Sequence, residues 1–286
     1  MSPDVKAFFD NATFTVTYVV TDPGSKKCAV IDPVLDYDAA SGRSSTKSAD
    51  DVIAFVESRG LSVEWILETH VHADHLTAAQ YLKQKLGGKI GIGANIAVIQ
   101  TVFNDVFNLH DVPDDGSHFD ELLGDGATIA LGGIEGHVMH TPGHTPACNS
   151  YVFGDACFVG DTLFMPDYGT ARCDFPGGDA AMLYDSIQKI FALPGSTRLF
   201  VCHDYKAPDR DEFAWETTVG AEREANINIH AGVTREEFVA FRTERDATLG
   251  MPKLILPSIQ VNIRAGQFPP PEDNNVSYLK IPLNRL

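Results

Sequence analysis

Positively charged residues are scarce in this sequence of 286 residues, in which 22 Lys and Arg face 39 Asp and Glu. The formal net charge at pH 7 is therefore -17. A chain this acidic repels other polyanions before any contact is made. The shortage of positive charge argues against nucleic acid and anionic membrane surfaces as partners, and it favours a ligand that is small, neutral or basic.

Long apolar runs and closely spaced cysteine pairs are also missing. No stretch approaches the roughly 20 apolar residues that a membrane span needs, and Asp4 and Lys6 interrupt the N-terminus. We therefore expect no membrane segment and no secretion signal. The five cysteines are well separated and include no Cys-x-x-Cys pair, which fits neither a disulfide framework nor a zinc knuckle. A reducing compartment, the cytoplasm, is the expected location.

Strand-like and helix-like segments alternate along the chain, which favours an α/β fold. Apolar runs bounded by turn residues predict strands at residues 13–20, 28–31, 63–67, 89–92, 128–131, 136–140, 150–153, 157–159 and 198–202. Helices are predicted over residues 48–60, from Asp74 to Gly87-Gly88, over 182–191, and from a Thr234/Glu237 capping box to about Leu249. Residues 35–48 are predicted to form a loop. We expect a catalytic core over residues 1–210, with residues 211–286 packed on it as an extension rather than a second domain.

The segment Thr69-His70-Val71-His72-Ala73-Asp74-His75 lies between a predicted strand and a predicted helix. Side chains that leave a sheet at such a point converge on a cleft. From composition alone, a His-x-His-x-Asp-His pattern arises by chance in roughly one such sequence in a thousand. Three imidazoles and a carboxylate in six residues suit a divalent transition metal.

Three further candidate ligands each follow an apolar run. They are His144 in Thr-Pro-Gly-His-Thr, Asp161 after a run ending at Gly160, and His203 after a run ending at Cys202. Groups at the ends of neighbouring strands meet at one rim of a sheet. A lone histidine is more often structural, but the order of these residues after the first motif favours a shared metal site.

The ordered set THVHADH, TPGHT, GDT and CHDY resembles the metallo-β-lactamase superfamily over about residues 10–210. This resemblance implies an αββα sandwich with metal bound at one sheet edge. Within the superfamily, the segments 70–77, 140–146, 160–164 and 171–175 most resemble the persulfide dioxygenases. Glyoxalase II is the nearest hydrolytic relative with similar motifs.

The dioxygenase pattern implies one Fe(II) per chain, held by His70, His144 and Asp161 as a two-His, one-carboxylate triad. It also implies that His72, Asp74, His75 and His203 orient the ligands and hydrogen-bond to water or substrate. In a two-metal hydrolase those four residues would themselves be ligands, and one or two Zn(II) ions are the alternative cofactor. Sequence spacing does not separate the two cases.

The resemblance also implies the substrates, which are glutathione persulfide and O₂, with sulfite and glutathione as products. Glutathione carries two carboxylates, so a local basic patch is expected, with Arg172, Lys206, Lys253 and Arg264 as candidates and Tyr205 near the thiol. Cys173 is expected to be a buried, inert thiol rather than an oxidation-sensitive one. A zinc thioesterase or lactonase is the first rival, and a non-catalytic sensor that retains the fold is the second. The oligomeric state stays open, with a homodimer as one option.

Overall fold

Two six-stranded sheets form the centre of the molecule, and the computed structural model describes residues 2–285. The first sheet contains, in spatial order, β1 (Asp4–Phe9), β2 (Val16–Thr21), β3 (Lys27–Ile31), β6 (Ser62–Leu67), β8 (Lys89–Gly93) and β9 (Glu121–Leu123). The second contains β10 (Thr128–Leu131), β11 (Ile134–His140), β12 (Asn149–Phe153), β13 (Ala156–Gly160), β14 (Arg198–Val201) and β15 (Glu216–Thr218). Strands β3, β6, β8 and β9 are mutually parallel, as are β13 and β14.

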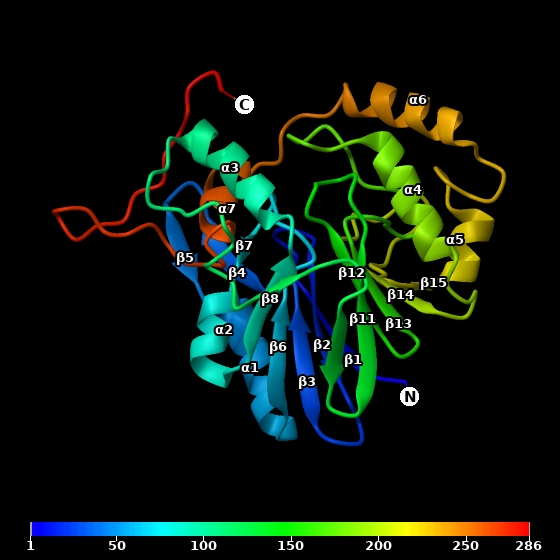
Figure 1. The fold of residues 1–286 in the computed structure, drawn as a ribbon, viewed down its shortest axis with the longest axis horizontal. Helices are drawn as coiled ribbons and strands as arrows, with labels where there is room; N and C mark the ends of the chain where they lie inside the picture. The colour runs from blue at the N-terminus through cyan, green and yellow to red at the C-terminus, as the bar shows by residue number, and fades with distance from the viewer. Residues whose placement is uncertain (1, 286) are drawn as a thin grey trace.

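Helices cover the outer face of each sheet, which completes the predicted αββα sandwich (Figure 1). The first helical layer consists of α1 (Lys47–Arg59), α2 (Ala79–Leu86), α3 (Ile96–Phe107) and α7 (Ile255–Asn262). The second consists of α4 (Ala180–Phe191), α5 (Val219–Ala225) and α6 (Arg235–Asp246). Within residues 2–285, no helix combines the length and the apolar character needed to cross a membrane.

The central strands are buried on both faces, as their continuous apolar sequences require. In β2, Val16, Tyr18 and Val20 point into the core between the two sheets. Val19, between them, packs instead against the first helical layer. This alternation follows from the two-residue repeat of a strand and fixes which face meets the second sheet.

Several helix ends follow their sequence signals. Gly60 ends α1 in the left-handed conformation at φ 60°, a position that glycine occupies without steric cost. The capping box of Thr234 and Glu237 begins α6, as predicted.

Other local predictions were wrong. Residues 35–48 overlap β4 (Val34–Asp38) and include β5 (Arg43–Ser45). Strand β4 pairs with both β5 and β7 (Leu76–Thr77) in a small third sheet. No helix begins at Asp74, because residues 76–77 pair with β4 and α2 begins only at Ala79. The sequence prediction also omitted β1, β9, β15, α3, α5 and α7.

The C-terminal residues contribute to both helical layers. Helix α6 packs on α4, whereas α7 packs on β7 and α3. Beyond α7 the chain runs along the α3 side of the molecule without regular structure (Figure 1). Residues 211–285 therefore lie against both halves of the sandwich.

Candidate metal centre and substrate cavity

The histidine run occupies the loop between β6 and β7, at the carboxyl end of β6. A residue far along the chain shapes this loop: Asn262, at the end of α7, donates from Nδ2 to the carbonyl oxygens of His72 and His75, each at 2.8 Å. Its Oδ1 accepts from the Thr77 backbone N–H at 2.9 Å. Sequence reasoning missed Asn262, because no local pattern marks a contact across 185 or more residues.

His70, His144 and Asp161 come together at this rim. One potential ligand atom from each lies within 4.8 Å of the others. Asp161 Oδ2 is 4.0 Å from His70 Nε2 and 3.7 Å from His144 Nε2. The three side chains come from the end of β6, the loop between β11 and β12, and the end of β13.

Hydrogen bonds fix the orientation of both histidines in this triad. Thr69 Oγ1 donates to Asp32 Oδ2 at 2.9 Å, so its lone pair is free to accept from His70 Nδ1 at 3.0 Å. His144 Nδ1 donates to the carbonyl oxygen of Arg172 at 2.8 Å. In both rings the Nδ1 proton is donated in a hydrogen bond, so the free lone pair is on Nε2.

Buried polar atoms in the triad lack hydrogen-bond partners among residues 2–285. His70 Nε2 and Asp161 Oδ1 are buried and accept no hydrogen bond from the described residues. Such groups are costly unless something else satisfies them. Burial also lowers the pKa of His70 well below its usual range, which favours the neutral imidazole that binds metal. Two imidazole nitrogens and a carboxylate therefore fit a divalent transition metal.

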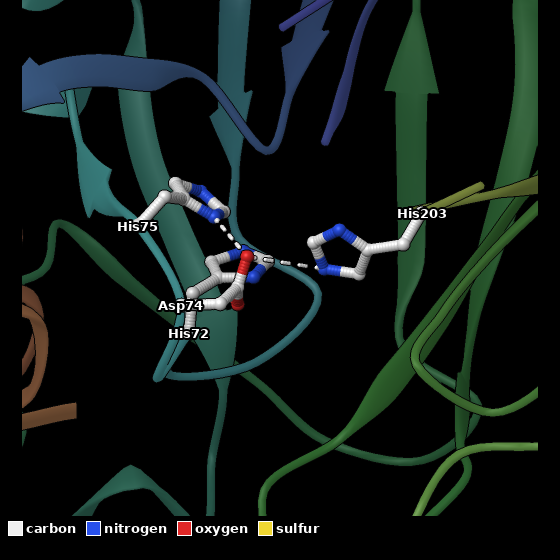
Figure 2. A group of neighbouring side chains, drawn as sticks. All are labelled: His72, Asp74, His75 and His203. Carbon is white, nitrogen blue, oxygen red and sulfur yellow. Dashed lines mark hydrogen bonds and ion pairs between the residues drawn. The ribbon is translucent and has the colours of Figure 1, made fainter. Parts of the chain in front are cut away.

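A second group of potential ligands adjoins the triad. His72, Asp74, His75 and His203 each have a potential ligand atom within 4.8 Å of the others, and Figure 2 shows them converging from the loop after β6 and the end of β14. Asp74 Oδ2 lies 3.2 Å from His75 Nδ1 and 3.5 Å from His203 Nε2. His203 Nε2 is also 3.4 Å from Asp161 Oδ1, so the two groups share one site.

Charge balance within the second group favours an ionised Asp74. Burial by itself would raise the pKa of Asp74, but the charges of His203 and His75 lower it well below its usual range. His75 Nε2 and His203 Nε2 are buried and have no hydrogen-bond partner among residues 2–285. This group is therefore also suited to hold a cation.

His72 differs from the other histidines because two buried carboxylates contact it. Its Nε2 is 3.0 Å from Asp32 Oδ1 and 3.3 Å from Glu68 Oε2. Burial alone would lower the pKa of His72, but the nearby charges of Asp32 and Glu68 raise it well above its usual range. Sequence reasoning missed both acids, although Asp32 follows the apolar strand β3 in the same way that Asp161 follows β13.

A cavity of about 900 Å³ opens onto the metal-site residues Asp74, His144 and Asp161. Its walls include the aromatic side chains of Phe14, Phe164, Tyr168, Phe175 and Tyr205. The Tyr205 ring stacks beside His203, with centroids 5.7 Å apart and an interplanar angle of 17°. Tyr205 therefore lies beside a candidate metal ligand, and its role near the substrate thiol stays a prediction.

The predicted substrate-binding cations are not all brought to the cavity. Arg172 and Lys253 line it, whereas Lys206 and Arg264 are not among its lining residues. Lys206 Nζ lies over the Phe213 ring, 4.4 Å from the centroid. The buried Arg264 guanidinium forms two hydrogen bonds with Asp111, at 2.7 and 3.0 Å. Arg264 is therefore occupied elsewhere in the fold.

The Arg172 guanidinium is also already engaged. It contacts both carboxylate oxygens of Asp174, at 2.5 and 2.6 Å, and the carbonyl oxygen of Gly250 at 2.6 Å. Sequence reasoning missed a further lining cation, Arg245, which is exposed on α6. Cys173, which follows Arg172 in the chain, is buried, and burial raises the pKa of its thiol.

The family model of the metallo-β-lactamase superfamily matches residues 10–203. The chain therefore belongs to the metallo-β-lactamase superfamily, as its motifs predicted. It is 56% identical to a probable metallo-hydrolase of Burkholderia pseudomallei, over 99% of both chains. It is 49% identical to glyoxylase B2 of Dictyostelium discoideum, over 99% of this chain and 97% of that one.

Persulfide dioxygenases are more distant relatives. The mitochondrial persulfide dioxygenase ETHE1 of Mus musculus is 28% identical over 93% of this chain and 90% of that one. Among solved structures, ETHE1 from Myxococcus xanthus superposes with a TM-score of 0.74 at 28% identity, covering 92% of this chain and 100% of that one. The family, the fold and a metal-dependent enzyme class follow from these likenesses.

Proposed function

We propose that this protein is a non-haem iron persulfide dioxygenase that oxidises glutathione persulfide with O₂ to sulfite and glutathione. The observation that carries the proposal is the triad of His70, His144 and Asp161. Both imidazoles are fixed with Nε2 free of hydrogen bonds, and His70 Nε2 and Asp161 Oδ1 are buried without a hydrogen-bond partner among residues 2–285. A two-His, one-carboxylate set is the usual protein environment of oxygen-activating non-haem iron.

Bound iron would supply a redox-active centre with open positions for a sulfur ligand and O₂, which zinc with its filled d shell does not supply. The residues of the chain orient the reactants around it. Thr69 and the Arg172 carbonyl fix the two histidine rings. Phe164 and Tyr205, with ring centroids 6.0 Å apart, form an apolar wall that limits access of water to the reacting sulfur.

The proposed reaction is balanced without a further oxidant. The terminal sulfur of the persulfide loses four electrons to O₂ and takes up both oxygen atoms. Water then cleaves the sulfur–sulfur bond, which releases sulfite and leaves the proton on the glutathione thiol. The cavity has room for a tripeptide, since its volume is about 900 Å³.

We further propose that Arg245 and Lys253 bind the glutathione carboxylates. Both are exposed and line the cavity, and neither forms an ion pair with a carboxylate among residues 2–285. Arg172 and Arg242 also line it, but Asp174 and Asp246 already neutralise them. A carboxylate is bound most favourably by a cation that is not already paired.

A zinc-dependent hydrolase is the second candidate, and a specific observation favours it. The group of His72, Asp74, His75 and His203 has the composition of a second metal site, and two of its Nε2 atoms have no hydrogen-bond partner among residues 2–285. The relatives at 56% and 49% identity also carry the names of a metallo-hydrolase and a glyoxylase. This candidate needs Asp74, His75 and His203 as direct metal ligands.

Reconstitution separates the two candidates. Metal-free protein is loaded anaerobically with either Fe(II) or Zn(II), and O₂ uptake and sulfite release are measured after glutathione persulfide is added. We expect turnover with iron alone and about one iron per chain. Equal sulfite release by the zinc-loaded protein, or no O₂ uptake with iron, would contradict the proposal.

A further inference from the structure

The backbone at Arg172 determines the orientation of a candidate metal ligand. His144 Nδ1 donates to the Arg172 carbonyl oxygen at 2.8 Å, and this is the hydrogen bond that frees Nε2. A shift of the peptide at Arg172 would therefore rotate the His144 ring or change which nitrogen carries its proton. The stretch from Thr170 to Cys173 contains no regular helix or strand of its own to hold it in place.

Two charged residues on α6 hydrogen-bond to this stretch. Arg242 donates from Nη1 to the Thr170 carbonyl oxygen at 3.1 Å and to Thr170 Oγ1 at 3.3 Å. Asp246 Oδ2 accepts from the Cys173 backbone N–H at 2.8 Å. Thr170 lies two residues before Arg172 and Cys173 lies one residue after it, so the two contacts flank Arg172.

Arg242 and Asp246 also hold each other. The Nε and Nη2 atoms of Arg242 donate to Asp246 Oδ1 at 3.0 and 2.6 Å. The two residues are only 4% and 6% exposed, so water does not compete effectively for these bonds. The planar guanidinium reaches Asp246 and Thr170 together, a geometry that an ammonium group cannot reproduce.

We propose that Arg242 and Asp246 are positioning residues for the metal ligand His144, acting through the backbone from Thr170 to Cys173. The chain of contacts runs from α6 to the segment, from the segment to His144 Nδ1, and so to the free Nε2 that lies 3.7 Å from Asp161. This inference rests on the metal site of the proposed function, but it holds for iron and zinc alike. A failed dioxygenase assay would therefore leave it standing.

The first test uses wild-type protein without metal. Nitrogen-15 NMR of histidine-labelled protein reports which ring nitrogen of His144 carries the proton. We expect His144 to be the Nδ1–H tautomer, with slow exchange of that proton. A dominant Nε2–H tautomer would overturn the proposal without any variant.

The second test compares two conservative variants of the same helix. Arg242→Lys keeps the charge but loses the fork that joins Asp246 to Thr170. The control, Arg235→Lys, breaks the exposed Arg235–Asp185 fork of 3.1 and 3.0 Å, which joins α6 to α4 away from the cavity segment. Anaerobic titration with Fe(II) should show about ten- to a hundredfold weaker binding for Arg242→Lys and no change for the control.

A third variant covers the possibility that Arg242→Lys does not fold. Asp246→Asn keeps an acceptor for the Cys173 N–H and nearly the same volume, but it weakens the hold on Arg242. We expect weaker Fe(II) binding and a mixed His144 tautomer here too. Folded variants with wild-type Fe(II) affinity and an unchanged Nδ1–H tautomer would show that the pair stabilises α6 alone.

Discussion

His72 Nε2 lies 3.0 Å from Asp32 Oδ1, in a contact that is closed to solvent on all sides. Glu68 Oε2 approaches the same nitrogen at 3.3 Å. The imidazole therefore balances two buried carboxylates, and its Nδ1 atom has no protein partner. This arrangement suits a group that supports the centre, whereas the hydrolase candidate would use that Nδ1 atom as a ligand.

We expect His72→Ala to retain most of its iron and to lose about ten- to a hundredfold in activity, the usual scale for a group that supports metal ligands. His70→Ala, by contrast, should lose the metal outright. Iron content and O₂ uptake are measured on the same preparations. If both variants proved equally metal-free, His72 would be a direct ligand and the mononuclear assignment would be wrong.

The Arg245→Ala/Lys253→Ala double variant should raise KM for glutathione persulfide by about tenfold or more, with kcat near its wild-type value. The reason is that contacts to the glutathione carboxylates, remote from the reacting sulfur, are expected to be equally strong before and during oxygen transfer. Lys206→Ala is a control, since it removes a positive charge that does not line the cavity. Arg172→Ala should change KM less than the double variant, because Asp174 and Gly250 already occupy its guanidinium. Steady-state O₂ uptake at several substrate concentrations measures all three. The assignment fails if Lys206→Ala raises KM as much as the double variant.

Arg210 joins the loops that follow β13 and β14. It contacts both carboxylate oxygens of Asp204, at 2.5 and 2.7 Å, and both of Asp167, at 2.7 and 3.0 Å. Because Asp204 is buried, Arg210→Lys should lower the free energy of unfolding by about 1 to 3 kcal/mol. Arg285→Lys, whose ion pair with Asp105 is exposed, should cost less than about 1 kcal/mol. Urea unfolding compares the two, and equal effects would show that the Arg210 bridge has no special role.

Glu222 should make stability depend on pH. Burial raises the pKa of this carboxyl from 4.5 to about 8, and its Oε1 atom has no protein partner. Between these two values the folded state keeps a proton that the unfolded state has released, so stability falls as pH rises and the loss is complete above about 8. Glu222→Gln does not titrate and imitates the protonated form.

The stability difference between Glu222→Gln and wild type should therefore grow with pH. One pKa unit corresponds to about 1.4 kcal/mol, so a gain of a few kcal/mol is expected between about pH 5.5 and about pH 8.5. Urea unfolding of both proteins at the two pH values measures it. A difference that stays constant with pH would mean that Glu222 ionises normally in the folded protein.

The residue pattern alone predicted an α/β fold, and the resemblance of its motifs to the metallo-β-lactamase superfamily predicted the αββα sandwich. The candidate ligands carried a local signal, because His70, Asp161 and His203 each follow an apolar strand. That signal did not show that β6 belongs to the first sheet whereas β13 and β14 belong to the second. The helix predicted from Asp74 was wrong because long-range contacts decide that loop. Asn262 hydrogen-bonds its backbone, and β7 pairs with β4.

Charge pairing was equally invisible in the sequence. Nothing in the sequence near Arg264 indicates its distant partner Asp111, and nothing marks Arg242 as tied to Thr170. The sequence therefore did not distinguish a cation that is free to bind substrate from one that is already paired with a carboxylate. The sequence also did not indicate that Asp32 and Glu68 both contact the His72 imidazole.

The most direct test of the proposed function compares two reactions of one preparation. Protein purified anaerobically is analysed for metal content, then assayed with glutathione persulfide for O₂ uptake and with lactoylglutathione for thioester hydrolysis. We predict about one iron per chain, one O₂ consumed for each sulfite formed, and negligible hydrolysis. Two zinc ions per chain with rapid hydrolysis and no persulfide-dependent O₂ uptake would contradict the account and establish the hydrolase.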